Sequence, residues 1–252
     1  FYFASLAVGG LFFTAIQHAV HAGWSVNIRR MSEAITAFLP VVFVGGLVLL
    51  LAGSNLYLWL DKEVVAHDAI LQGKSAYLNN TFWAVRMVIY MGLWLFFGKK
   101  IISYSVAQDK DGDEGWTHKL VPVSVAFLLV FALSYSLFSV DLLMSLEPHW
   151  FSTIFGVYCF AGLFQSTLAF LILLTLYCMS KCWVTGLMTM EHVHYLAKFL
   201  KGFTVFWAYI AFSQFMLIWY ANLPEETVFY LHRSHGGWMY VSVGLLVFKF
   251  IV

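Results

Sequence analysis

The stretch SVDLLMSLEPHWFSTIFGVY at residues 139–158 contains two apolar runs separated by a short polar break. The break is Glu147-Pro148-His149, and a proline disfavours helical geometry at the residue before it. We therefore expect one helix to end here and a second helix to begin directly after the turn. Asp141 lies inside the first run, where a carboxylate is costly unless it faces protein or water. The stretch thus predicts a helical hairpin with an acid close to its turn.

Composition places this hairpin in a membrane. The chain has 252 residues, of which 62% are hydrophobic and only 11% are charged. A soluble core cannot absorb that much apolar surface, so the class is a polytopic α-helical membrane protein. A membrane β-barrel would show alternating segments of about ten residues, and the sequence has none. The net charge is +1 and no basic tract is present, so we expect a lipid bilayer and no nucleic acid as the partner.

Seven apolar stretches are long enough, or nearly so, to cross a bilayer, which takes about 20 residues. They predict an all-α transmembrane bundle of about seven helices that forms a single domain over residues 1–252. The chain opens at Phe1 and stops at Val252 within apolar runs, so we expect at least one further helix beyond either end. The predicted helices cover approximately residues 1–17, 38–60, 81–104, 120–146, 150–179, 202–223 and 237–252.

The connecting loops predict the orientation of this bundle. The first, third and fifth loops carry nine Lys and Arg residues, whereas the second, fourth and sixth carry three. The positive-inside rule places the first set in the cytoplasm and the second set at the outer face. The ionisable residues that then fall at the outer face are Asp141, Glu147, His149, Glu225 and Glu226. Four tryptophans near that face predict an aromatic belt: Trp59, Trp83, Trp150 and Trp219.

Asp141 is the most informative single residue. It lies about five residues, or roughly 7–8 Å, inside the outer end of its helix, and Arg86 lies roughly 9 Å deep in the preceding helix. An ion pair between them would remove two uncompensated charges from lipid, whereas Arg86 could instead extend to the interface. Ser134 and Ser145 share a helical face with Asp141. Asp141 is interpreted either as a proton-relay or ligand-binding acid, or as a residue that fixes the turn.

Two turns at the outer face carry further candidates. In EPHWFST at 147–153, the imidazole of His149 could exchange protons with Glu147 or a bound quinol. The alternative is a capping and interface turn. NLPEET at 222–227 is a second acidic turn, where polar side chains could gather protons or simply hold helices together. The candidates there are Glu225, Glu226, Tyr220 and Gln214.

The sequence shows no pattern that would ligate a cofactor. Membrane b-type cytochromes hold haem between His pairs deep in facing helices, whereas the nine His here lie in loops or near helix ends. The three Cys form no CxxC pair and no zinc spacing. DKDGDEG at 109–115 lacks the Gly and Glu positions of an EF-hand loop. We therefore expect no metal and no ligated cofactor in this chain.

Three segments carry a resemblance to a known family: residues 139–162 (SVDLLMSLEPHWFSTIFGVYCFAG), 212–229 (FSQFMLIWYANLPEETVF) and 21–40 (HAGWSVNIRRMSEAITAFLP). They resemble the ActF subunits of bacterial alternative complex III, which belong to the NrfD/PsrC-like membrane anchors of quinone-linked oxidoreductases. The first two segments are long enough to be specific, and the resemblance covers the whole chain. It implies a multi-helix anchor in the bacterial inner membrane, built largely from two four-helix bundles.

The resemblance also implies partners and a site. A related NrfD-like subunit, ActC, would lie beside this chain, and quinol oxidation would be linked to iron–sulfur and multihaem cytochrome subunits. Electrons would pass to a monohaem cytochrome c or directly to a terminal oxidase. Subunits of this family carry no redox centre, so the resemblance implies no ligated cofactor in this chain, with menaquinone or menaquinol and phospholipids as the small molecules expected nearby. By analogy with the sister subunit, Asp141 and His149 would fall at a quinol pocket, and a role in proton conduction or assembly stays open.

Three functions are therefore weighed. The first is a non-redox membrane subunit of a quinol-oxidising complex, in which Asp141, His149 and Glu225 form an outer-side proton route or a quinone site. The second is an independent secondary transporter. Transporters bind substrate at broken helices near the bilayer midplane, whereas the candidate charges here lie close to one face. The third is a structural scaffold that holds a sister subunit and lipids.

Overall fold

The computed structural model describes residues 1–53 and 56–251, with the side chains of 250 and 251 left aside. Every regular element in these residues is a helix, and no strand occurs among them. Six helical segments are long and apolar enough to cross a membrane, as a multi-pass membrane protein requires. They are α1 (Tyr2–Ala19), the pair α2 (Val26–Thr36) and α3 (Leu39–Ala52), α6 (Asn80–Asp111), α7 (Gly115–Leu142), α8 (Phe155–Ser180) and α9 (Met190–Ala221).

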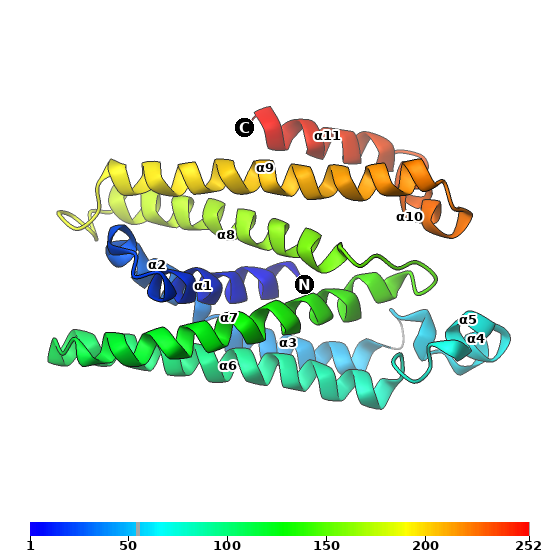
Figure 1. Cartoon of the computed structure of the whole chain (residues 1–252), viewed down its shortest axis with the longest axis horizontal. Helices are drawn as coiled ribbons and strands as arrows, with labels where there is room; N and C mark the ends of the chain where they lie inside the picture. The colour runs from blue at the N-terminus through cyan, green and yellow to red at the C-terminus, as the bar shows by residue number, and fades with distance from the viewer. Residues whose placement is uncertain (54–55, 252) are drawn as a thin grey trace.

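The long helices run side by side, and their connections alternate between two ends of the molecule (Figure 1). One end carries α2 and the α6–α7 and α8–α9 turns. The other end, on the right of Figure 1, carries the short helices α4 (Lys62–His67), α5 (Ala69–Gly73) and α10 (Pro224–Ser234), and the turn between α7 and α8. The Lys- and Arg-rich loops and the loops with few basic residues thus lie at opposite ends, as the predicted topology requires. The candidate residues in the turns at 147–149 and 222–227 lie at the same end.

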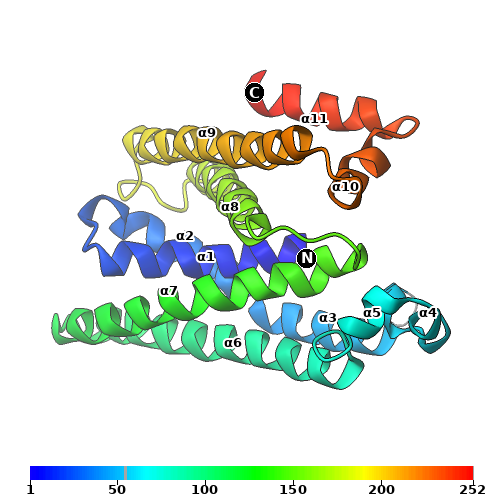
Figure 2. The same ribbon diagram turned by 45° about the vertical axis from the view of Figure 1, so that its right-hand side comes forward.

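The seventh apolar stretch is shorter than a full crossing. It forms α11 (Trp238–Ile251), which follows α10 and returns alongside α9 (Figure 2). Its closest backbone neighbour is α10. Helices that pack directly have axes about 8–10 Å apart, and α8 and α9 contact each other in that way over their lengths. The described residues therefore contain six membrane-length segments and one shorter apolar helix, where the sequence predicts a bundle of about seven helices.

Several expected boundaries differ from the structure. The α6 helix continues to Asp111 rather than ending near 104, and α7 begins at Gly115 rather than near 120. The second helix ends at Ala52, and Leu58–Leu60 form a separate 3-10 turn, while residues 54 and 55 of the predicted 38–60 helix lie outside the described residues. The α9 helix begins at Met190, well before 202, because Thr189 and His192 form a reciprocal capping box there. The α8 helix begins at Phe155 rather than near 150, because residues 147–154 are held in an extended turn by contacts to other segments.

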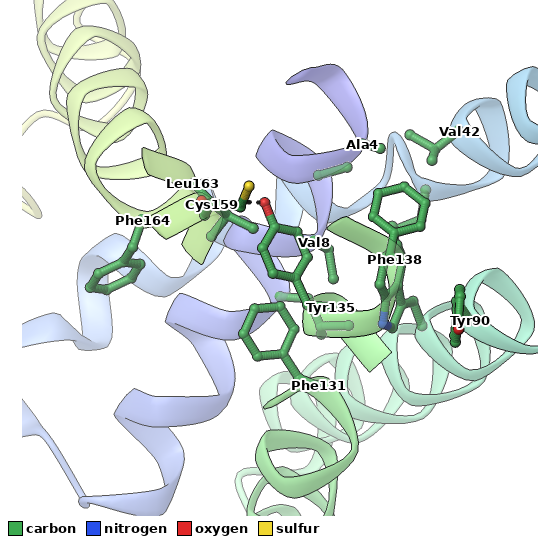
Figure 3. Close-up of a cluster of buried hydrophobic side chains, with 14 of the residues drawn as sticks. Ala4, Val8, Val42, Tyr90, Phe131, Tyr135, Phe138, Cys159, Leu163 and Phe164 are labelled. Carbon is green, nitrogen blue, oxygen red and sulfur yellow. Dashed lines mark hydrogen bonds between the residues drawn. The ribbon is translucent and has the colours of Figure 1, made fainter. Parts of the chain in front are cut away.

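The centre of the bundle is α1, of which 72% is buried inside the protein. It packs against α2, α7 and α8. Close approach depends on glycine: a Cβ on Gly10 would lie 2.8 Å from the carbonyl oxygen of Ser32, and one on Gly9 would collide with Thr167. Figure 3 shows the core here, where Phe131, Tyr135 and Phe138 of α7 point towards α1, and the Tyr135 hydroxyl points towards Cys159 of α8.

The predicted aromatic belt is wrong for three of its four members. Trp59, Trp83 and Trp150 are only 4%, 0% and 3% exposed, so they face protein and not lipid. Trp59 and Trp83 pack edge to face, with ring centroids 5.6 Å apart. Trp219 is 69% exposed and is the only one of the four on the outer surface of the bundle. Trp83 is enclosed by Tyr57 and Trp59 from the segment that follows α3, whereas Trp150 is covered by Phe229 of α10.

Candidate functional site

The structure brings Arg86 of α6 and Asp141 of α7 together as a buried ion pair. Arg86 Nε donates to Asp141 Oδ2 at 2.8 Å and Arg86 Nη2 donates to Oδ1 at 2.9 Å, a bidentate geometry. The Tyr90 hydroxyl, one turn further along α6, donates to Oδ2 at 3.0 Å. Asp141 is 0% exposed and Arg86 is 6% exposed. The ion pair favoured from their equal depths is therefore present, and Arg86 does not extend to the interface.

Aromatic rings cover the guanidinium side of the Arg86–Asp141 pair. The Arg86 guanidinium lies 3.8 Å from the ring centroid of Tyr77 and 4.3 Å from that of Phe82. Its Nη1 donates to the backbone oxygen of Tyr77 at 3.0 Å. Burial, followed by the nearby Asp141 charge, raises the pKa of Tyr57 and of Tyr77 to about 12. Both phenols therefore stay neutral over the physiological range and cannot serve as ready proton acceptors beside the carboxylate.

This geometry favours a structural role for Asp141. The carboxylate accepts three hydrogen bonds from α6, so proton uptake would break a saturated contact between two helices. The predicted serine face is buried as well. Ser134 accepts a hydrogen bond from Trp94 Nε1 at 2.9 Å, and Ser145 donates to the backbone oxygen of Asp141 at 2.7 Å. These contacts fasten α7 to α6 and close the end of α7.

The turn 147–149 is fixed by contacts from both sides. On one side, His149 Nε2 lies 2.5 Å from Asp68 Oδ2, and Lys74 Nζ donates to the backbone oxygen of Pro148 at 2.6 Å. On the other side, Arg233 Nη1 of α10 donates to Glu147 Oε1 at 3.3 Å. The turn therefore joins the α4–α5 segment to α10 at the end of the molecule that carries these short helices.

Asp68 has a second role as the N-cap of α5. Its Oδ1 accepts hydrogen bonds from the backbone N–H groups of Ile70 at 2.9 Å and Leu71 at 3.2 Å. The Leu71 N–H group is the main cause that lowers the pKa of the Asp68 carboxyl below its usual value, and His149 adds to it. His149 therefore pairs with a carboxylate that also accepts hydrogen bonds from the N-terminus of α5.

The acidic turn at 222–227 does not join the other candidates. Glu225 is exposed and Glu226 is half-buried in the first turn of α10, where carboxylates favour the helix N-terminus. Tyr220 is 86% exposed. Gln214 is buried, and its Oε1 accepts a hydrogen bond from Ser152 at 2.6 Å. Of this group, only Gln214 contacts the segment that follows the 147–149 turn.

A large cleft of about 1140 Å³ lies between the N-terminal part of α1 and helices α7 to α11. It has the size and mostly apolar character of a small-molecule site with a few polar groups. Its aromatic lining includes Tyr135, Phe155, Tyr158, Trp207, Phe212, Phe215, Phe229 and Tyr230, and its polar lining includes Ser5, Ser166, Gln214, Arg233, Ser242 and Lys249. Asp141, Glu147 and His149 are not among the lining residues.

Residues 139–162 and 212–229 meet at this cleft although they are distant in sequence. Trp150 stacks on Phe229 with centroids 4.1 Å apart and an interplanar angle of 19°. The Ser152–Gln214 hydrogen bond joins them again. Phe155, Tyr158 and Gly162 from the first segment and Phe215, Ile218 and Thr227 from the second line the cavity. The two segments together therefore form one wall of the cleft.

A polar cluster at the opposite end escapes prediction from the sequence. Arg30 of α2 forms ion pairs with Glu33 and with Asp109 of α6. The Ser105 hydroxyl donates to Glu33 Oε1 at 2.7 Å, and Glu33 is only 5% exposed. This cluster fastens α2 to the end of α6. Glu33 belongs to a short amphipathic helix, so its sequence pattern gives the ordinary signal of a solvated face.

Other contacts could have been found from the sequence. Tyr90 lies four residues after Arg86, which places both on one face of α6. Lys249 lies within the apolar stretch 237–252, where a charge is a signal for a functional site. The Asp68–His149 pair has no such signal, because nothing in the sequence aligns two polar residues from separate loops.

The fold and the cleft define a multi-pass α-helical membrane protein with an apolar cavity open among its helices. Within the described residues, no three His, Cys, Asp or Glu side chains gather closely enough to hold a metal ion. Neither the models of known protein families nor the curated proteins show a match to this chain.

Proposed function

We propose that this chain is an integral membrane subunit, without a redox centre of its own, of a respiratory complex that oxidises quinol. The observation that carries the proposal is the convergence on one apolar cleft of residues 139–162 and 212–229, the two most specific segments of the resemblance. Segments that are specific in sequence and adjacent in space are typical of a shared site. The cleft is apolar and aromatic, as a site for a lipophilic ring compound is.

The proposal moves the candidate quinol site away from Asp141 and His149. Asp141 is saturated by Arg86 and Tyr90, and His149 is paired with Asp68. We assign these residues a structural role at the end of the bundle that faces the periplasm of a bacterial inner membrane. The loop charges support this orientation, because the Lys- and Arg-rich loops share the opposite end.

The proposed partners are those that the resemblance implies: the sister subunit ActC, iron–sulfur and multihaem cytochrome subunits, and an electron acceptor that is a monohaem cytochrome c or a terminal oxidase. The chain offers broad apolar surface for such contacts, since α3 and α9 carry many exposed hydrophobic side chains. Exposed examples are Val44, Val48, Leu51, Phe212, Leu217 and Trp219. Lipid would cover the part of this surface that no subunit covers.

Purification of the native protein in a mild detergent tests the proposal. We expect haem-containing and iron–sulfur subunits to remain with the chain in fixed stoichiometry, and the assembly to reduce a cytochrome c when a short-tailed menaquinol is supplied. A single monodisperse protein with no haem absorbance would contradict the proposal. The variant Glu225→Gln serves as a control, because Glu225 is exposed and lies outside the cleft.

One observation favours a second candidate, the secondary transporter. Lys249 lies far from both ends of the bundle, so the charged groups are not all close to one face, contrary to what is expected from the sequence. A charged residue near the midplane is typical of transporter substrate sites. Uptake of a labelled solute into vesicles that contain only this chain would favour the transporter, and loss of all activity without partner subunits would favour the complex.

A further inference from the structure

Lys249 of α11 lies far from both ends of the helical bundle, beside the middle of the long helix α9. It follows Trp238, the first residue of α11, by about 16 Å of helix rise, which is roughly half of the ~30 Å hydrocarbon core. Its Nζ lies 3.4 Å from the ring centroid of Trp207, near the middle of α9. The side chain thus reaches across the cleft from α11 to α9 at mid-depth.

The ammonium of Lys249 has an aromatic neighbour and no carboxylate. Among the described residues, no Asp or Glu oxygen lies within 4 Å of Lys249 Nζ. The charged residues that line the cleft in that part of the chain are Arg233 and Lys249, both cationic. A cation–π contact compensates only part of the lost hydration of an ammonium group. An oxygen acceptor supplied by a ligand would provide the missing partner.

We propose that Lys249, together with Trp207 and Tyr158, receives the head group of a lipophilic quinone or quinol in this cleft. The inference rests on the proposed function and places the site within it. A quinone is neutral, so its ring can reach mid-depth without the cost of a buried anion, whereas a phospholipid phosphate would stay at the interface near Arg233. Its carbonyl oxygens accept hydrogen bonds, and the Lys249 ammonium has three donors.

The walls at this depth suit a flat ring with an apolar tail. The rings of Tyr158 and Trp207 have centroids 5.9 Å apart and an interplanar angle of 36°. Because Gly162 has no side chain, the edge of the Trp207 ring beside it stays uncovered. A Cβ on Gly162 would lie 3.9 Å from Trp207, an ordinary contact distance. Leu245 and Leu246 of α11 line the same cleft and offer the apolar surface that an isoprenoid tail needs. The Tyr158 hydroxyl is a second donor for the ring oxygens.

The test uses the whole complex in mild detergent and a short-tailed menaquinone as the probe, with binding followed by quenching of tryptophan fluorescence. Lys249→Met keeps the length of the side chain but removes the charge, so we expect affinity to fall at least about tenfold, the loss of one charged hydrogen bond. Lys249→Arg keeps a donor and should retain binding within about threefold. Gly162→Ile fills the space beside Trp207 and should abolish binding while leaving Lys249 in place. Retention of the partner subunits verifies that each variant is assembled.

Each outcome decides the inference. Unchanged affinity in Lys249→Met and Gly162→Ile, with binding intact in the wild type, would overturn the site and leave the proposed function standing. Failure of the wild-type complex to bind or oxidise the menaquinone probe would overturn both. Quenching by a brominated anionic phospholipid that the menaquinone does not compete away would show that lipid occupies the cleft, and would also overturn the inference. Lys198→Met serves as the matched control, because Lys198 is an exposed cation of α9 that does not line the cleft, and binding should be unchanged in this variant.

Discussion

Removal of one partner of the Arg86–Asp141 pair should destabilise the bundle strongly. Asp141→Leu deletes the acceptor of three hydrogen bonds, at 2.8, 2.9 and 3.0 Å, and leaves the guanidinium 6% exposed with no carboxylate. Loss of one member of a buried ion pair costs about 3–5 kcal/mol. Arg86 keeps its bond to the Tyr77 backbone oxygen and its aromatic neighbours, so we expect the middle of that range, about 4 kcal/mol.

The double variant Asp141→Leu/Arg86→Met separates the energy of the ion pair from the energy lost through changed packing. Arg86→Met alone should cost about as much as Asp141→Leu, because each leaves one buried charge. The double variant removes both charges from an apolar interior, so its cost should stay near about 1 kcal/mol. The coupling energy is then several kcal/mol. Unfolding in mixed micelles of mild detergent and dodecyl sulfate, followed by circular dichroism, measures each value.

The Glu147–Arg233 pair provides a matched control in the same chain. The side chain of Glu147 is half-buried at 28% and that of Arg233 is exposed at 47%, so the coupling energy of this pair should be about 0.2–1 kcal/mol. If the costs of Asp141→Leu and Arg86→Met simply add, the pair does not hold α6 to α7. If Asp141→Asn leaves stability unchanged but abolishes quinol oxidation by the complex, the structural role assigned to Asp141 is refuted and a proton-relay role is supported.

Two further predictions concern the end of the molecule that carries α4, α5 and α10. Because backbone N–H groups lower the folded-state pKa of Asp68, its stabilisation of α5 is present above the unfolded value of about 3.9 and is lost as pH falls through the lowered value. Amide-exchange protection at Ile70 and Leu71 should therefore drop in acid, and Asp68→Asn should remove this dependence; acid-insensitive protection in the wild type would contradict the capping role. Brominated lipid should quench Trp219 but not Trp59 or Trp83, as single-tryptophan variants would report, and equal quenching of all three would restore the predicted belt.

The class of fold follows from the sequence because apolar run length is a strong signal. The helical hairpin around Pro148 and the equal depth of Arg86 and Asp141 both follow from simple spacing, and the structure contains both. The exact ends of the helices do not follow. The start of α9 depends on a capping box that extends the helix beyond its apolar part, and the start of α8 depends on tertiary contacts of Trp150.

The candidate site is harder to predict than the fold. Asp141 is a strong signal for function, but its saturation by Arg86 and Tyr90 depends on side-chain geometry that spacing alone does not give. The cleft combines residues of α1 with residues of α7 to α11, so no local sequence pattern contains it. Gln214 is the one predicted candidate that lines it. Lys249 is visible in the sequence as an isolated charge in an apolar run, and only the neighbouring Trp207 and the cavity give it a site.

The central position of α1 has a consequence for biogenesis. The six membrane-length segments differ in exposure: 72% of α1 is buried, against 22% of the Gly23–Ala52 segment, which is also the most hydrophobic, whereas α1 is the least. A helix shielded by protein can carry polar groups such as Thr14 and His18, but a translocon that reads hydrophobicity inserts it weakly. Its partner Tyr135, bonded to Ser5, is synthesised 130 residues later. Stable insertion of α1 should therefore wait for α7 and α8, and nascent chains that stop before α7 should leave α1 poorly inserted and open to quality-control proteases.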